Sequence, residues 1–482
     1  MLFWAVMMGL LLHREVIVPR ASATVFSHRF EQPEDLWMGV YLAEGAERVG
    51  FINVRSTPKQ RNGEKGAEMG LAARLKFSLF GRRTELFLTG KAWIAMGQGL
   101  SSFDFSLKSG AQRMRIEGAV MEGVLEAQLH TAGETIPFSF PIDEKLMLSG
   151  GMAMPSLEMP TLEPGEEVYI DTFDPTTMDV GRAKLTCVGE ETLEWDGETV
   201  AVSVIETSVG GITTKAWVTD EQDILRAETA LGFVLERISP QEAMAPIEPT
   251  QKANLIRALA VQPTGPQPWR GVEMLNVRFS GIDDAVLPPS SPVQTRTPAG
   301  YVITTPEPPD DEAAGEPLPE EERTKYLASD PFVQSDHPRI RKAAQEAVGE
   351  ATEAWPRALA LYKALYETIE KKSVLSVPSA LDVLQSREGD CNEHTVLFVA
   401  MARALEIPSR IAIGLTWSDR LEGFGYHAWP EVYVGRWIPM DPTLGQPIAD
   451  ATHIKLLEGS IDQWPQLLPY IGQVQMEIID VK

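Results

Sequence analysis

The sequence predicts an α+β protein in which a mostly antiparallel β domain precedes a domain that contains helices. Two observations predict this order. Between residues 37 and 239 apolar and polar side chains alternate, with turn residues between the runs, as in antiparallel strands. Between residues 337 and 405 apolar side chains instead recur three and four positions apart, as in helices. We expect the β part to be a strongly curved sheet or half barrel.

Length and charge limit what the protein can be. With 482 residues the chain is too long for one hydrophobic core, and we expect two or three compact units. The hydrophobic fraction of 44% and the charged fraction of 23% are ordinary for a soluble globular protein. The formal net charge of −25 argues against a nucleic-acid partner, because phosphate binding requires clustered lysine and arginine.

Residues 1–23 are expected to form a signal-like or anchor segment. Residues 2–12 are an apolar run that is too short for a membrane span, which needs about 20 residues. Residues 21–23 (ASA) supply a cleavage pattern of small residues. These features predict an exported protein, periplasmic or membrane-anchored, with the C-terminal domain outside the cytoplasm. The alternative is a buried N-terminal segment.

The β domain is assigned to residues 24–283. Its clearest strands are "RTELFLTGKAWIAM" and "ETVAVSVIETSV", and the pairs Asp196-Gly197 and Gly210-Gly211 have the composition of hairpin turns. Residues 150–167 interrupt the alternation and are expected to form a long loop or crossover.

Residues 284–324 are expected to form an acidic, proline-rich linker. This stretch contains "LPPSSPVQTRTP" and "PEPPDDEAAGEPLPEEER". Such a composition cannot bury enough apolar surface to fold alone, so we expect a linker or a strap over the surface. It marks the boundary to the C-terminal domain, which is assigned to residues 325–482.

The C-terminal domain begins with helical patterns. Residues 337–372 fit two helices with an interruption at Pro356, and residues 379–386 fit a short third helix. Residues 391–405 ("CNEHTVLFVAMARAL") are so apolar that we expect a helix buried on most sides. The pattern then predicts a strand at "RIAIGLTW" and a hairpin across "YHAWPEVYVGRWIPMDPT".

Cys391, in "GDCNEH", lies in the first turn of the predicted buried helix. There, unpaired backbone N–H groups and the positive end of the helix dipole favour a thiolate and can receive an oxyanion. His427 begins one strand of the hairpin and Asp441 ends the next. These are the parts of a nucleophilic cysteine site, in which His427 takes the thiol proton and Asp441 holds the imidazole tautomer.

Three motifs carry a resemblance to a known family: "GDCNEHTVLFVAMARALEIPSRIAIG", "FGYHAWPEVYVGRWIPMDPT" and "ATHIKL". In this order, over residues 325–460, they resemble the bacterial transglutaminase-like (transglutaminase core) domains, relatives of the papain-type cysteine enzymes. The resemblance implies a papain-like fold for the C-terminal domain. It also implies that Cys391 is the nucleophile, His427 the base and Asp441 the orienting group.

The function that this resemblance implies is a cysteine-dependent acyl transfer on amide bonds of proteins or peptides. Cys391 would attack the carbonyl of a glutamine side chain or a peptide bond and form a thioester. The acceptor would then decide between peptidase, deamidase and transglutaminase activity. No cofactor and no metal are implied. A β domain followed by such a core is also similar to exported bacterial proteins, so the β domain could bind an envelope protein partner.

The hairpin that carries His427 and Asp441 places a constraint on its own turn. If Gly435-Arg436 formed a two-residue turn, residue 430 would pair with residue 441 and Asp441 would face away from His427. We therefore predict a three-residue connection or a bulge, which Pro439 in the second strand also favours.

Four further residues are candidates for contact with the substrate or the oxyanion: Gln385, His394, Tyr426 and Trp429. Gln385, on the helix before the nucleophile, could supply a side-chain donor. His394 lies one helical turn after the nucleophile and could contact the substrate or only pack against the neighbouring strand. Tyr426 and Trp429 are expected to wall the cleft.

Both cysteines are expected to be free thiols. Cys187 lies alone in a strand-like segment and is expected to be a small buried side chain. A disulfide between Cys187 and Cys391 would remove the nucleophile. Glu393, beside the nucleophile, would oppose thiolate formation, so we expect it to point outward or to pair with Arg403 or Arg410.

Three alternatives stay open from the sequence. Cys391, His394, His427 and Asp441 could be four metal ligands, for zinc in particular, although their spacing lacks a second close pair. The C-terminal domain could be a non-catalytic module whose cleft only holds a peptide. The chain could also be a structural envelope protein whose function lies in the β domain.

Overall fold

The computed structural model describes most of the chain in segments separated by gaps. The described residues are 32–42, 47–79, 82–109, 112–130, 135–142, 146–148, 161–174, 179–209, 212–229, 232–247, 259–281, 290–309, 317–372, 379–459, 467 and 471–482. The predicted signal-like or anchor segment at residues 1–23 lies outside them. No helix in these segments is both long and apolar enough to cross a membrane.

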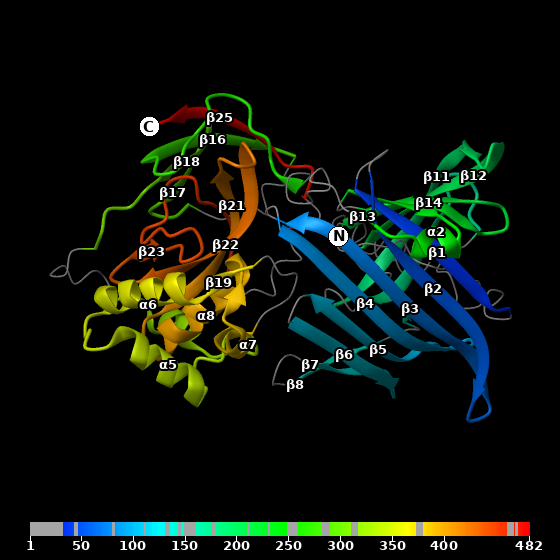
Figure 1. Ribbon diagram of the computed structural model, residues 1–482, viewed down its shortest axis with the longest axis horizontal. Coiled ribbons are helices and arrows are strands. Elements are labelled where there is room, and N and C mark those ends of the chain that lie inside the picture. Colours follow the sequence, from blue (N-terminus) through cyan, green and yellow to red (C-terminus); the bar gives the residue numbers. More distant parts are fainter. Residues whose placement is uncertain are drawn as a thin grey trace, which may run out of the picture.

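One sheet dominates the N-terminal half (Figure 1). Its strand order is β8-β7-β6-β5-β4-β3-β2-β1-β15-β14-β13-β12-β11-β10-β9, and every pairing is antiparallel except β9 with β10. The predicted large antiparallel sheet is thus confirmed. The strands are β1 (Glu34–Leu42), β2 (Arg48–Arg61), β3 (Glu64–Leu79), β4 (Arg82–Ala95), β5 (Gly99–Ser109), β6 (Gln112–Met121), β7 (Val124–His130), β8 (Thr135–Pro141), β9 (Met147–Leu148), β10 (Glu167–Asp174), β11 (Asp179–Trp195), β12 (Glu198–Val209), β13 (Ile212–Val218), β14 (Ile224–Glu228) and β15 (Phe233–Arg237).

Tight turns hold neighbouring strands of this sheet in register. Asp196 and Gly197, between β11 and β12, both have positive φ angles, 51° and 81°. A two-residue turn with two positive φ angles has the twist that a hairpin needs, and a glycine adopts that conformation at little cost. The hairpin predicted at Asp196-Gly197 is confirmed, whereas Gly210-Gly211 lies outside the described residues.

The sheet curls so that its two halves share one core. The Phe103 ring in β5 lies 4.9 Å from the Phe173 ring in β10, measured between centroids, although these strands are far apart in the sheet order. Beside them, the Leu100 N–H donates to the Leu146 carbonyl at 2.7 Å. Figure 1 shows the blue and cyan strands in one layer and the green strands in another. A short helix, α2 (Pro240–Met244), follows β15.

The segment predicted as a linker contributes to a second sheet. Its order is β17-β18-β16-β25, formed by β16 (Met274–Ser280), β17 (Gln294–Thr297), β18 (Gly300–Thr304) and the C-terminal β25 (Gln475–Val481). β17 and β18 fall within residues 284–324, and the helix α4 (Glu320–Leu327) begins within them. This differs from the linker prediction. β18 pairs with β16, and β16 pairs in turn with β25, with Val277 opposite Ile478 some two hundred positions away, so local composition cannot reveal this sheet.

The C-terminal part packs helices against a third sheet. The helices are α5 (Pro338–Val348), α6 (Ala354–Thr368), α7 (Ala380–Ser386) and α8 (Cys391–Ala404). The sheet order is β23-β22-β21-β24, with β21 (Ser409–Ser418), β22 (Gly423–Tyr433), β23 (Trp437–Pro439) and β24 (Ile454–Gly459). α8 is buried from Glu393 to Arg403, as predicted, and packs on β22. Pro356 lies in the first turn of α6, where its missing N–H costs nothing.

Candidate active site

The capping of α8 fixes the position of Cys391. The Asp390 carboxylate accepts from the Asn392 backbone N–H at 3.3 Å, and the Glu393 carboxylate accepts from the Asp390 N–H at 2.9 Å. This reciprocal capping box satisfies two N–H groups that a helix start leaves unpaired. Gly389 makes room for it, because a Cβ there would lie 2.2 Å from the Glu393 Cβ. Cys391 is therefore the first helical residue, as predicted.

The orientation of Glu393 differs from the prediction. Its side chain is fully buried and turned towards the helix cap, not outward. Arg403 instead donates to the Ser409 and Ala328 carbonyls, and Arg410 pairs with Glu431. The capping box explains the difference, since it requires the third residue of the helix to reach back to the cap.

The hairpin turn brings Asp441 to His427. β22 and β23 are joined by three residues, with Tyr433 opposite Trp437 and Gly435 at a φ of 83°. The predicted three-residue connection is thus confirmed. Beyond it, the Asp441 Oδ2 atom lies 2.7 Å from His427 Nε2. Both side chains are buried, so this hydrogen bond is shielded from water.

Asp441 is held from both of its oxygens. Oδ1 accepts from the backbone N–H groups of Thr443 and Leu444, each at 2.8 Å. Oδ2 accepts from His427 and, at 3.0 Å, from His453 Nε2. Burial acts to raise the pKa of Asp441, but the charges and hydrogen bonds of the two histidines outweigh it and hold this pKa well below its usual range. The carboxylate is therefore ionised and fixed.

The backbone of Ala428 joins the cysteine helix to the histidine strand. Its N–H donates to the Cys391 sulfur, and its carbonyl accepts from the Thr395 hydroxyl at 3.1 Å. Thr395 is one turn further along the same face of α8. The half-buried Cys391 thiol is thus held against the strand residue that follows His427.

The surroundings of Cys391 favour the thiol over the thiolate, which differs from the expectation of a favoured thiolate. Burial raises its pKa well above the ordinary value, and the nearby carboxylates of Asp390, Glu393 and Asp441 add to this effect. The Ala428 N–H acts in the opposite direction without reversing it. The helix-start position alone therefore does not determine the ionisation state, because the acidic cap of the same helix opposes it.

Alkylation of Cys391 by iodoacetamide should accordingly be slow at pH 7 and accelerate about tenfold per pH unit up to at least about pH 9, because only the thiolate reacts. A mass-spectrometric time course on the native protein measures this. Cys187, a free thiol buried in β11, is the internal control for loss of the fold. A rate already maximal below pH 8 would instead demonstrate a resting thiolate and contradict this geometry.

Three of the four residues that were predicted to contact the substrate or the oxyanion have different surroundings. Trp429 is buried, with its ring centroid 6.2 Å from that of His427, so it backs the imidazole. Tyr426 immediately precedes His427 in β22 and therefore points to the other face of the sheet. Gln385, on α7, is exposed, and no described residue of the site is bonded to it.

His394 lies inside the site region but is engaged with the backbone. Its Nδ1 atom is 2.6 Å from the Asp390 carbonyl and must carry a proton, because a carbonyl only accepts. Burial lowers its pKa to about 4, so the ring is neutral. Its Nε2 atom is buried without a hydrogen-bond partner among the described residues.

The four-ligand metal set considered from the sequence is not assembled. Among the described residues, the group whose ligand atoms lie within 4.8 Å of one another is His427, Asp441 and His453, without Cys391 and His394. These three side chains are joined by direct hydrogen bonds.

His453 and its second partner, Asp450, were not predicted as site residues. The position of a histidine in "ATHIKL", shortly after Asp441, was the signal available.

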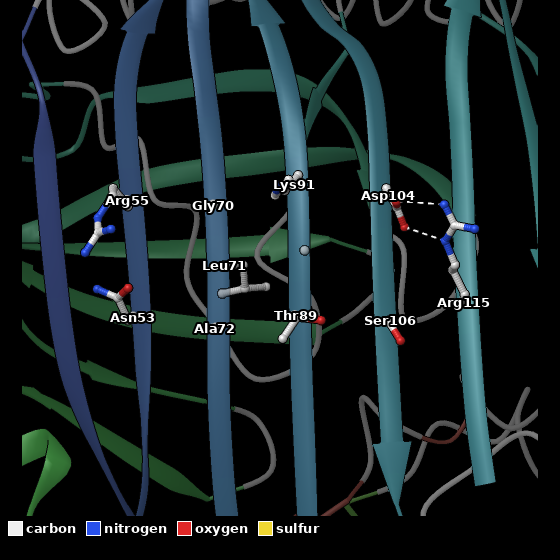
Figure 2. Close-up of a pocket in the computed structure, with 11 residues that line it drawn as sticks. Asn53, Arg55, Gly70, Leu71, Ala72, Thr89, Lys91, Asp104, Ser106 and Arg115 are labelled. Carbon is white, nitrogen blue, oxygen red and sulfur yellow. Dashed lines mark hydrogen bonds and ion pairs between the residues drawn. The ribbon is translucent and has the colours of Figure 1, made fainter.

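A separate hollow of about 510 Å³ lies on the exposed face of the large sheet (Figure 2). Its floor is formed by small residues such as Gly70 and Ala72. At its edge Asp104 and Arg115 pair with each other, with Arg115 Nε to Asp104 Oδ1 at 2.8 Å. Its lining residues include neither a cysteine nor a histidine.

This arrangement of a cysteine, a histidine and a carboxylate is typical of cysteine-dependent enzymes. Residues 341–442 match the family model described as Transglutaminase-like superfamily. The C-terminal part of this chain therefore contains a transglutaminase-like domain, and the predicted resemblance is confirmed. The matched range includes Cys391, His427 and Asp441 but ends before His453.

Solved structures give weaker likenesses. A "Putative Cysteine Protease" from Cytophaga hutchinsonii is 19% identical, with 45% of this chain and 81% of that chain covered and a TM-score of 0.28. A β-barrel-like protein of unknown function from Brucella abortus is 7% identical, with 42% and 94% covered and a TM-score of 0.29. TM-scores this low establish neither the fold nor the activity of this chain. Comparison with curated proteins gave no match.

Proposed function

We propose that this protein is a cysteine-dependent acyl-transfer enzyme that acts on amide bonds of proteins or peptides through a thioester. One observation carries the proposal. The strand β22 presents a histidine bonded to Asp441 at 2.7 Å, and its next residue, Ala428, donates its N–H to the Cys391 sulfur. The proposed base, on β22, thus adjoins the strand residue that holds the sulfur of the proposed nucleophile on α8. In this proposal the C-terminal domain has the papain-like arrangement of a cysteine helix packed on an antiparallel sheet.

The bonding of His427 determines which of its nitrogens is the base. Nε2 faces the ionised Asp441, which can only accept, so Nε2 carries the ring proton. The free lone pair is therefore on Nδ1. Because the Cys391 thiol is protonated at rest, its proton passes to Nδ1 as the sulfur attacks, and no thiolate needs to accumulate beforehand.

The reaction then proceeds in two steps, acylation of Cys391 and deacylation of the thioester. Sulfur attack on the amide carbonyl forms a C–S bond and an oxyanion, which the positive N-terminal end of α8 stabilises. The His427 imidazolium donates its Nδ1 proton to the amine nitrogen, the C–N bond breaks, and a thioester remains. Water or an amine next attacks the thioester, giving its proton to His427, and the Cys391 thiol is regenerated. Water gives hydrolysis or deamidation, and an amine gives cross-linking.

The test uses p-nitrophenyl acetate, a reactive acyl donor that does not require the natural substrate. The wild-type protein should release p-nitrophenol in a stoichiometric burst and gain an acetyl group at Cys391 that hydroxylamine removes. Cys391→Ala should show neither, while Cys187→Ala should behave as wild type because Cys187 is buried in the β domain. Circular dichroism on all three proteins controls for folding. A folded wild-type protein that is no more reactive than Cys391→Ala would overturn the proposal and favour a non-catalytic peptide-binding module.

A further inference from the structure

His453 is fixed between two carboxylates at the centre of the domain. Its Nε2 atom is 3.0 Å from Asp441 Oδ2, and its Nδ1 atom is 3.2 Å from the Asp450 carbonyl and 3.4 Å from Asp450 Oδ1. Every one of these partners only accepts hydrogen bonds when Asp441 and Asp450 are ionised. Both ring nitrogens of His453 must therefore carry protons, so the ring is a buried cation.

Asp450 is the second ionised carboxylate beside His453. Its Oδ1 atom accepts from the Thr452 N–H at 2.9 Å and from the Thr452 hydroxyl at 2.5 Å. Its Oδ2 atom accepts from the Gly271 N–H at 2.7 Å and from the Gln446 amide at 2.5 Å. Burial acts to raise the pKa of Asp450, but its bonds to His453, Thr452 and Gly271 outweigh burial and lower it. The same two carboxylates raise the pKa of His453 to about 9 against the effect of burial.

We propose, resting on the acyl transfer proposed above, that His453 is a positioning residue: a cationic second imidazole that anchors Asp441 and leaves His427 neutral and available as the base. The charges explain why a second cation is needed. Asp441 and Asp450 are two buried anions, and if His453 were neutral, His427 would be the nearest group able to neutralise them. It would then retain its proton and could not accept one from the thiol. His453 supplies the positive charge without taking part in proton transfer.

The packing around His453 fixes this arrangement. Trp429 contacts both imidazoles, with centroid distances of 5.1 Å to His453 and 6.2 Å to His427. The other charged groups that line the small cavity beside His453 are Glu431 of β22 and Lys455 of β24. These two pair with each other at 3.1 Å and so leave the charge balance of the site unchanged. His453 and Asp450 therefore act on His427 through Asp441, and Lys371 and His394 are the further titratable groups whose charges act on Asp441.

The first experiment reads the ring protonation directly, without any need for activity. Nitrogen-15 NMR of histidine-labelled wild-type protein, with the seven histidines assigned by single substitutions, should show His453 doubly protonated at pH 7.5 and titrating near pH 9. A singly protonated His453 at pH 7.5 would overturn the proposal. This result is independent of whether the acyl-transfer function is correct.

The second experiment tests the consequence for His427 with His453→Gln, which keeps a donor but removes the charge. In the p-nitrophenyl acetate assay the acidic midpoint of the pH–rate profile should rise by at least about one pH unit, so that at a pH well below both midpoints the rate should fall by at least about tenfold. His130→Gln, at a partly exposed position in β7, is the matched control. If folded His453→Gln loses rate with an unchanged midpoint, His453 is only structural and the proposal is wrong. If the variant does not fold, the NMR titration decides alone.

Discussion

Replacing Asp441 with asparagine is expected to lower the rate constant for acylation of Cys391 by about 10³- to 10⁴-fold, a loss typical of a wrong histidine tautomer. The asparagine oxygen would keep the place of Oδ1, because the Thr443 and Leu444 N–H groups need an acceptor there. The amide nitrogen would then face His427 in place of Oδ2. An amide nitrogen donates, so His427 Nε2 would have to accept, and its proton would move to Nδ1. With Nδ1 protonated, no lone pair remains for the thiol proton.

The measurement for Asp441→Asn is the p-nitrophenol burst rate at pH 7.5, with the extent of folding checked by circular dichroism. Asp419→Asn is the matched control, because Asp419 is an exposed carboxylate just after β21 that accepts from the Trp417 indole N–H at 2.8 Å. That control should stay within about twofold of the wild type. A folded Asp441→Asn protein within tenfold of the wild-type rate would remove Asp441 from the proposed mechanism.

The arrangement of the site was predictable from the sequence where the relevant information is local. Cys391 at a helix start follows from a glycine and a capping aspartate before an apolar run. The pairing of His427 with Asp441 follows from strand alternation together with the three-residue turn, since a change of one residue would have put Asp441 on the other face. These features depend on a few neighbouring residues.

Other features of the site depend on distances that the sequence does not contain. Glu393 could be recognised as acidic, but only the folded cap shows that its carboxylate turns inward and disfavours the thiolate. His453 reaches Asp441 because the loop between them folds back, and the histidine in "ATHIKL" does not by itself show this contact. The strand β16 likewise finds its partner, β25, at the opposite end of the C-terminal half. Propensity and periodicity describe segments, whereas these properties belong to contacts between segments.

A buried ion cluster beside the site gives the largest expected effect on stability. Glu431, 2% exposed, accepts from Arg410 Nε at 2.7 Å and from Lys455 Nζ at 3.1 Å. Both cations are also buried, and the remaining anion near them is Glu458, which is partly exposed. Replacing Glu431 with glutamine would leave two buried positive charges with a single partner. We expect the free energy of unfolding of this region to fall by about 3–5 kcal/mol.

Hydrogen exchange on the full chain measures this loss, through amides of β21 and β24, the two strands that carry Arg410 and Lys455. Glu458→Gln at the rim of the same cluster is the control and should cost no more than about 1 kcal/mol, because solvent screens its charge.

The pH dependence of stability provides a second check. Burial acts to raise the pKa of Glu431, but Lys455 and Arg410 lower it overall, so its contribution is present above the ordinary pKa of about 4.3 and is lost as the pH falls through the depressed value. The difference between Glu431→Gln and wild type should therefore be full at pH 7 and shrink in acid. A constant difference across that range would mean that packing, and not charge, makes Glu431 necessary.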